Sequence, residues 1–158
     1  MREYFGRCSR EEIAGQAFAI NISLLRTLSE TLGIPFVLTL GWLETDGKPH
    51  FEHGDELLER LMKDGISAYP DGLPLYAWLT SPACEVVDAT LPTTIAAATG
   101  EPGLAGGIVY ISNQDPPPSV IYHPTVVGID FLDKIGATIA LESGGIDARQ
   151  GSAGPLFR

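Results

Sequence analysis

The sequence of 158 residues contains few cysteines, few basic side chains and no long apolar run. The two cysteines, Cys8 and Cys84, are too few for a disulfide framework, which fits a protein of the reducing cytoplasm. A membrane-spanning helix needs roughly 20 apolar residues, and no stretch of the chain approaches that length. The opening stretch MREYFGRCSREE also lacks the apolar core of a signal peptide. We therefore expect a cytoplasmic protein that does not associate with membranes.

Basic residues are outnumbered two to one, because 10 Lys and Arg stand against 20 Asp and Glu, for a net charge of −10. Nucleic acids are bound through clusters of Lys and Arg, and the sequence has no such cluster, so we expect no nucleic-acid partner. The acidity either keeps the chain soluble or forms a face that docks on a basic protein partner. Composition leaves both interpretations open.

The sequence also lacks a pattern that would bind a metal ion. No pair of Cys or His residues has the spacing typical of a zinc site. His50 and His53 are three residues apart, but the neighbouring Pro49 predicts that they lie in a loop. We expect neither a metal nor another cofactor.

The composition that remains is that of an ordinary globular domain. Hydrophobic residues make up 44% of the chain and charged residues 19%, and 158 residues are enough to bury a core. We expect a single domain over residues 1–142. The last segment, 143–158, is rich in glycine and is expected to be a flexible tail.

The predicted elements begin with a long helix over about 10–32. A capping box from Ser9 to Glu12 starts this helix, apolar residues recur along it at helical spacing, and Gly33 and Pro35 end it. We predict strands over 35–43, 75–80, 84–87 and 107–112, and one or two short strands within 120–128. Helices are predicted over 54–63 and 93–98, and a helix or a strand over 131–141. The expected fold class is α+β, with the long N-terminal helix packed on a mainly antiparallel sheet.

Two segments carry the strongest functional signal. The stretch 75–90, LYAWLTSPACEVVDAT, is a predicted strand pair that places Tyr76 on one strand and Asp88 at the end of its neighbour. The segment 15–21, GQAFAIN, begins the packed part of the long helix, and the strand after it contains Gly41 followed by Trp42.

These segments resemble the papain-like and transglutaminase-like cysteine hydrolases. In that group the strand pair has the approximate motif H-A-W followed by D-P-T, and the start of the helix has the motif G-x-C-[aromatic]-x-x-N. The resemblance covers about 15–90, somewhat under half of the chain. It implies a papain-like fold in which the helix start carries the nucleophilic thiolate, one strand carries the histidine base, and the next strand carries the aspartate that orients it.

In this chain the chemistry of that constellation is altered. Ala17 stands in the Cys position, Tyr76 stands in the His position, and only Asp88 is retained. Alanine has no nucleophile, and a phenol with a pKa near ~10 is a poor general base at neutral pH. We therefore expect a pseudoenzyme that binds a protein or peptide in the former active-site cleft, with inhibition of its partner as one form of that role.

The residues expected to contact the partner are Gln16 and Asn21 on the helix and the two tryptophans, Trp42 and Trp78. Each also has a plainer structural interpretation. The tryptophans are more often anchors of a core or a sheet face than ligand platforms. Tyr76, likewise, is expected to hydrogen-bond Asp88 and so satisfy a buried carboxylate.

Two other functions remain open at this point. A live thiol enzyme would use Cys8, next to the predicted helix start, with a base from His50, His53 or His123. A structural or oligomeric module would interact through its proline-rich loop and its tail. Cys84 falls in a predicted strand and is expected to be a small core residue.

Overall fold

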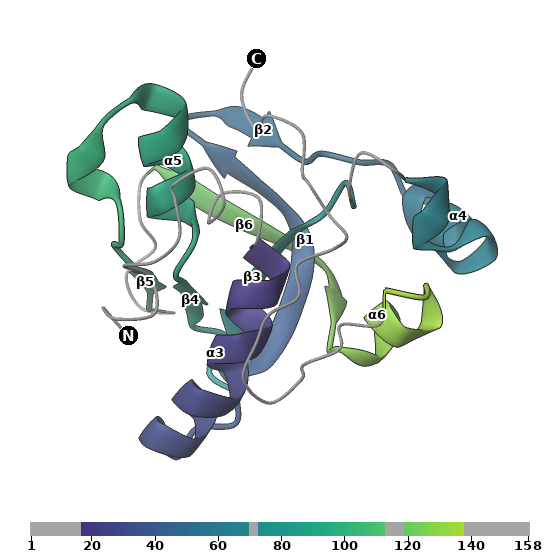
Figure 1. Ribbon diagram of the computed structural model, residues 1–158, viewed down its shortest axis with the longest axis horizontal. Coiled ribbons are helices and arrows are strands. Elements are labelled where there is room, and N and C mark those ends of the chain that lie inside the picture. Colours follow the sequence, from purple (N-terminus) through teal and green to yellow (C-terminus); the bar gives the residue numbers. More distant parts are fainter. Residues whose placement is uncertain (1–16, 70–72, 113–118, 138–158) are drawn as a thin grey trace.

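The structure is a computed structural model that describes residues 17–69, 73–112 and 119–137. Its elements follow one another in this order: α3 (Ala17–Leu32), β1 (Val37–Thr45), β2 (Lys48–His50), α4 (Glu56–Asp64), η1 (Ile66–Ala68), β3 (Tyr76–Thr80), β4 (Val86–Asp88), α5 (Leu91–Thr99), η2 (Pro102–Leu104), β5 (Val109–Ile111), β6 (Val120–Val127) and α6 (Asp130–Lys134). A long helix precedes an antiparallel sheet (Figure 1), so the expected α+β class is confirmed.

Several predictions fall on residues that lie outside the described ranges. They concern Cys8, the capping box that begins at Ser9, Gln16, the proline-rich loop and the tail over 143–158. These stay predictions. Within the described residues, no helix is both long enough and apolar enough to cross a membrane.

The long predicted helix is confirmed from Ala17 onwards. Its apolar side chains, among them Ile22, Leu25 and Leu28, pack against the buried cluster on the sheet. The helix ends after Leu32 because Gly33 adopts a φ of +66°, a left-handed conformation that glycine adopts without steric cost.

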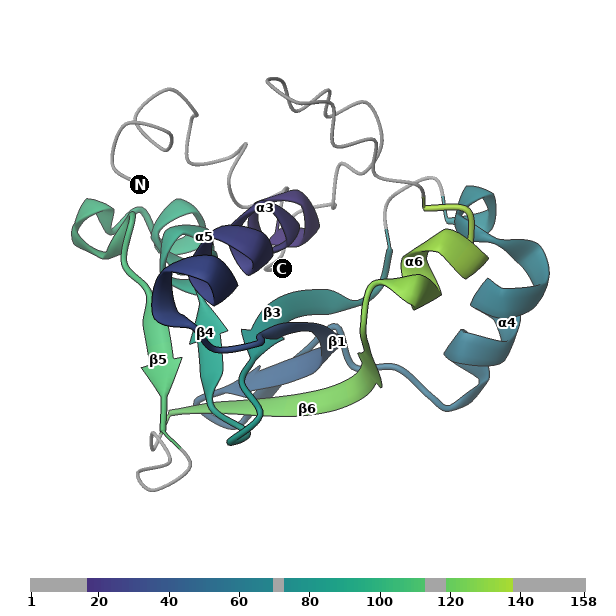
Figure 2. The same cartoon turned by 90° about the horizontal axis from the view of Figure 1, so that it is seen from below.

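The sheet is antiparallel throughout, and β1 is its central strand. Along β1, Val37–Gly41 pairs with β3, Leu43–Thr45 pairs with β2, and Thr39–Thr45 pairs with β6. The sheet continues from β3 to β4 and then to β5. It is curled, so that β4 and β5 turn away from the plane of β1 and β6 (Figure 2).

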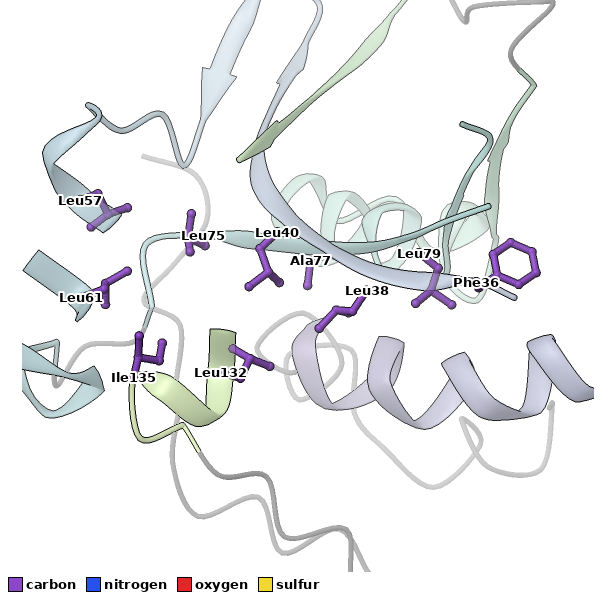
Figure 3. Close-up of a cluster of buried hydrophobic side chains, with 10 residues drawn as sticks. All are labelled: Phe36, Leu38, Leu40, Leu57, Leu61, Leu75, Ala77, Leu79, Leu132 and Ile135. Carbon is purple, nitrogen blue, oxygen red and sulfur yellow. The ribbon is translucent and has the colours of Figure 1, made fainter. Parts of the chain in front are cut away.

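The curl gives the sheet an outer and an inner face, and each face buries its own cluster of side chains. The outer face packs against α3, α4 and α6, as Figure 3 shows, and its cluster consists of Phe36, Leu38, Leu40, Leu57, Leu61, Leu75, Ala77, Leu79, Leu132 and Ile135. The inner cluster consists of Ala17, Leu43, Tyr76, Trp78 and Leu91, with Phe51, Val86, Ile95, Val109, Val120 and Tyr122 packed around it. The two faces alternate along β3, as the period of two of a strand requires.

The loop that Pro49 predicted around His50 contains a short strand, β2, formed by Lys48–His50. Asp46 and Gly47 both have positive φ, at 50° and 76°, which is the geometry of a tight hairpin turn. That turn folds the chain straight back onto β1, and Pro49 is tolerated because β2 is a three-residue strand that pairs only with β1.

The prediction for Cys84 was wrong, since this residue is exposed and lies in the turn between β3 and β4. The Ser81 carbonyl accepts a hydrogen bond from the Cys84 amide at 2.9 Å, and the Ser81 amide donates to the Glu85 carbonyl at 2.9 Å. These bonds close a tight turn in which Cys84 has a φ of +60°. The apolar run of β4 therefore begins only at Val86.

The last two predicted elements differ from expectation. The strand region 120–128 forms a single strand, and the segment predicted over 131–141 forms a helix of five residues. Residues 120–127 form one strand, β6, even though Pro124 interrupts the pattern of backbone donors. The β6 strand shifts register opposite Leu40 and Gly41, which accommodates the extra residue. The segment after it forms a short helix, α6, that ends at Lys134.

Candidate functional site at the start of α3 and the β3–β4 strands

Tyr76 and Asp88 come together on the inner face, as the sequence predicted. Tyr76 opens β3 and is 2% exposed, whereas Asp88 ends β4 and is 0% exposed. The Tyr76 hydroxyl lies 3.3 Å from Asp88 Oδ1. Its shorter contact, at 2.8 Å, is with the Thr90 hydroxyl. Because the Thr90 hydroxyl itself donates to Asp88 Oδ1 at 2.8 Å, the main connection runs from Tyr76 through Thr90 to the carboxylate.

The Asp88 carboxylate is also tied to the backbone that follows it. Its Oδ1 accepts hydrogen bonds from the amides of Thr90 and Leu91, at 2.8 and 3.0 Å. Its Oδ2 accepts one from the Tyr122 hydroxyl on β6 at 2.9 Å. Short Asp side chains commonly bond to amides two or three residues onward. Asp88 therefore anchors the start of α5 and links β3, β4 and β6 around one buried group.

Burial dominates the ionisation of this cluster. It raises the pKa of Asp88 above its ordinary value, although the hydrogen bonds from Thr90, Leu91 and Tyr122 oppose the shift. Burial, together with the nearby Asp88 charge, raises the pKa of Tyr76 well above its ordinary value. The same two causes raise the pKa of Tyr122. Both phenols therefore stay protonated at neutral pH and act as hydrogen-bond donors, not as bases.

Ala17 lies in the same inner cluster as Tyr76 and Trp78, at the start of α3, and is 7% exposed. One turn further along, Asn21 is fully buried, and its Nδ2 donates to the carbonyls of Ala17 and Ala77, at 2.8 and 2.9 Å. β4 pairs with β3 only at Leu79 and Thr80, so the Ala77 carbonyl lies beyond that ladder. Asn21 thus joins α3 to β3 at a position where β3 is not paired with β4.

The two predicted binding tryptophans point to opposite faces of the sheet. Trp78 is 1% exposed on the inner face and meets the Tyr122 ring edge-on, with ring centroids 5.0 Å apart. Trp42 is half-buried and stacks flat on His123, with ring centroids 3.6 Å apart and an interplanar angle of 6°. Trp78 is therefore a core anchor in this conformation, and Trp42 is the more accessible of the two.

Gly41 makes the packing of Trp78 possible. A Cβ atom at this position would lie 2.9 Å from the Trp78 ring and would collide with the carbonyl oxygen of His123. The register shift of β6 brings that carbonyl close to β1 at this point. The glycine is needed here for space.

The three histidines have other neighbours. His50 Nε2 lies 2.7 Å from the Thr45 hydroxyl. His53 contacts the Phe51 carbonyl through Nδ1 and the Thr125 hydroxyl through Nε2. His123 stacks on Trp42, and its Nε2 lies 4.0 Å from Glu44 Oε2. His50 was predicted to lie in a loop, but it is the last residue of β2. The hairpin turn brings it into register with Leu43 of β1.

Sequence reasoning missed three contributors to the site, namely Thr90, Tyr122 and Phe51. Thr90 follows Asp88 by two residues, and that spacing is a recognisable signal for a local Asp-to-backbone turn. Tyr122 lies 34 residues from Asp88 along the chain, and only the pairing of β6 with β1 brings it near. Phe51 follows β2 and packs on Tyr76, with ring centroids 5.5 Å apart.

Among the described residues, no group of three or more His, Cys, Asp and Glu side chains is arranged to hold a metal ion. In comparisons with known proteins, the chain matches no protein-family model, no curated protein and no solved structure. The geometry of Ala17, Tyr76 and Asp88 is therefore the observation on which a functional proposal rests.

Proposed function

We propose that the chain is a catalytically degenerate domain of the papain-like or transglutaminase-like kind, and that it works by binding a protein or peptide. The observation that carries the proposal is the meeting of three positions. Ala17 on α3 and Tyr76, the first residue of β3, belong to one buried cluster, and the Tyr76 hydroxyl contacts Asp88, the last residue of β4. A cysteine hydrolase needs its nucleophile, base and orienting carboxylate in such an arrangement.

The side chains at these positions support binding over catalysis. The methyl group of Ala17 has no atom that could attack a carbonyl. Tyr76 is a protonated phenol bonded to Thr90, so it cannot accept a proton from a nucleophile. Asp88 directs its oxygens to Thr90, Leu91 and Tyr122, which is a structural use of a carboxylate.

The partner that best fits the chain is a basic protein or peptide. The net charge of −10 attracts cationic partners and repels nucleic acids and anionic surfaces. We place its binding region where the start of α3 meets the first residues of β3, next to the strand connection that carries Phe51. Asn21 and Trp78 are buried within this region, whereas Trp42 points to the opposite face of the sheet and lies outside it.

The test is a library of random peptides presented to the purified chain. We expect basic peptides to bind and to shift NMR signals of α3, β3 and the Phe51 connection, while mass spectrometry of the recovered peptides shows no cleavage. Cleavage of amide or isopeptide bonds that disappears in Asp88→Asn would contradict the proposal. Peptides that bind only elsewhere on the surface would contradict the assigned region.

A further inference from the structure

Phe51 has a backbone conformation that a bulky side chain rarely adopts. Its φ is +61°, in the left-handed region that is normally reserved for Gly, Asn and Asp. Such a conformation persists only when the surrounding structure enforces it, and such residues cluster at ligand clamps and switch regions. The benefit that offsets this strain is the contact of the Phe51 ring with Tyr76, at a centroid distance of 5.5 Å and a tilt of 34°.

His53 holds the backbone of this segment in place. Its Nδ1 bonds the Phe51 carbonyl at 2.8 Å, and its Nε2 bonds the Thr125 hydroxyl on β6 at 3.1 Å. The imidazole thus links the Phe51 connection to β6, which lies on the other side of β1 from β2. The connection itself leads from β2 to α4 (Figure 1), so it can move without breaking a strand pairing.

Exposed acidic residues follow Phe51 along the chain. Glu52 follows Phe51 directly, and Asp55 and Glu56 follow within the next few residues, all of them exposed. The Phe51 ring is half-buried, whereas the Tyr76 ring beneath it is 2% exposed. An aromatic side chain with cationic neighbours would match both the apolar contact and the acidity of this segment.

We propose that Phe51 is an internal stand-in for a ligand: its ring occupies a subsite beside Tyr76 that takes an aromatic side chain of a basic peptide. Binding exchanges the Phe51 ring for the partner's ring, and release of the strained φ at Phe51 favours the exchange. The inference rests on the proposed function and adds the class of side chain that the site accepts.

The first test compares the wild-type chain with Phe51→Gly, which removes the ring and relaxes the backbone. The probes are capped tripeptides with the sequences Arg-Phe-Arg, Arg-Ala-Arg and Glu-Phe-Glu. We expect Arg-Phe-Arg to bind Phe51→Gly about tenfold more tightly than wild type, because the site no longer contains a competing ring. Saturable shifts of the Trp78 indole signal should report the binding, and the other two probes should bind more weakly.

The matched control is Phe131→Ala, which removes an aromatic ring from the outer cluster instead. It should leave the affinity for Arg-Phe-Arg at the wild-type level. An equal gain in Phe51→Gly and Phe131→Ala, or equal binding of Arg-Phe-Arg and Arg-Ala-Arg, would overturn the subsite.

A second variant decides the matter if Phe51→Gly does not fold. Thr125→Val removes the hydroxyl that holds His53 while keeping the shape of the side chain and leaving Phe51 in place. We expect faster amide exchange over 51–54 and tighter binding of Arg-Phe-Arg than in wild type. Unchanged exchange together with unchanged affinity would overturn the inference.

The two proposals can fail separately. A chain that binds library peptides at α3 and β3, but whose variants gain no affinity for Arg-Phe-Arg, keeps the proposed function and loses the Phe51 subsite. A chain that cleaves peptides loses the proposed function, whatever the tripeptides do.

Discussion

At the scale of single residues, Asp88 organises the candidate site. It accepts hydrogen bonds from two backbone amides and from hydroxyl groups on β6 and at the start of α5, and it is completely buried. A buried carboxylate of this kind is stable only while its donors remain in place, and the donors depend on it in return.

Replacing Asp88 should therefore be costly, in a way that depends on the replacement. Asp88→Ala leaves the amides of Thr90 and Leu91 without their acceptor, and we expect the free energy of unfolding to fall by about 3 kcal/mol or more. Asp88→Asn keeps an acceptor oxygen and should cost less. Urea denaturation followed by circular dichroism measures both, and equal losses for the two variants would contradict the anchoring role.

The pH dependence of stability gives a second residue-scale prediction. Because burial raises the pKa of Asp88 in the folded state, the folded chain holds this proton more tightly than the unfolded chain, whose Asp pKa is near ~3.9. Below that value Asp88 is protonated in both states, so its ionisation does not affect stability there. As the pH rises through it toward the folded pKa, wild type should lose stability relative to Asp88→Asn, and the difference should then stay constant.

Urea denaturation of wild type and Asp88→Asn from pH 3 to pH 8, as ~1-unit steps, would follow this difference. A difference that grows in favour of wild type as the pH rises would mean that the hydrogen-bond donors outweigh burial.

Gly41 supplies a third prediction at this scale. Gly41→Ala would place a methyl group against the His123 carbonyl and the Trp78 ring, and overpacking of this kind lowers stability by about 1 to 3 kcal/mol. The matched control is Gly103→Ala, because a Cβ there meets nothing within 4 Å. We expect that control to stay within about 0.5 kcal/mol of wild type. Equal thermal unfolding of both variants would contradict the packing described at Gly41.

At the scale of elements, Asn21 joins α3 to the sheet. Asn21→Ala would leave the Ala77 carbonyl without its side-chain partner, and we expect a loss of about 1 to 3 kcal/mol in the free energy of unfolding. Ser23→Ala is the control, since the Ser23 hydroxyl bonds only the Ala19 carbonyl of its own helix. Similar stabilities of the two variants would show that Asn21 does not hold the helix to β3.

The elements that sequence predicted well are those with a strong local pattern. α3 has helical spacing and a terminal glycine, and β1 and β3 have apolar runs between turn residues. The strand β2 was missed because its Lys-Pro-His sequence carries no strand signal, and it forms only because the preceding turn folds it onto β1. Local patterns predict an element when the element is stabilised locally.

The candidate site shows the same division. Tyr76 and Asp88 could be paired from the sequence because their strands are neighbours joined by a short turn. Tyr122 could not, because it reaches Asp88 through the register of β6 on β1, which no local pattern encodes. The strained φ of Phe51 likewise follows from tertiary contacts and leaves no trace in the composition around it.

At the scale of the whole molecule, the curled sheet brings the start of α3 and the ends of β3 and β4 to one place. Ala17 is the first residue of α3 that the structure describes, and it stands where the resemblance places the nucleophile. We propose that this place is the frame of a cysteine-hydrolase site without its reactive groups.

The most direct test restores those groups in one chain, by combining Ala17→Cys and Tyr76→His with Cys8→Ser and Cys84→Ser. Circular dichroism first establishes that this variant is folded, and NMR then follows the titration of the introduced thiol. We predict a thiol pKa well below the ordinary value of ~8.5, returning toward that value when Asp88→Asn is added. A thiol pKa at or above ~8.5 in the folded variant, insensitive to Asp88→Asn, would contradict the claim.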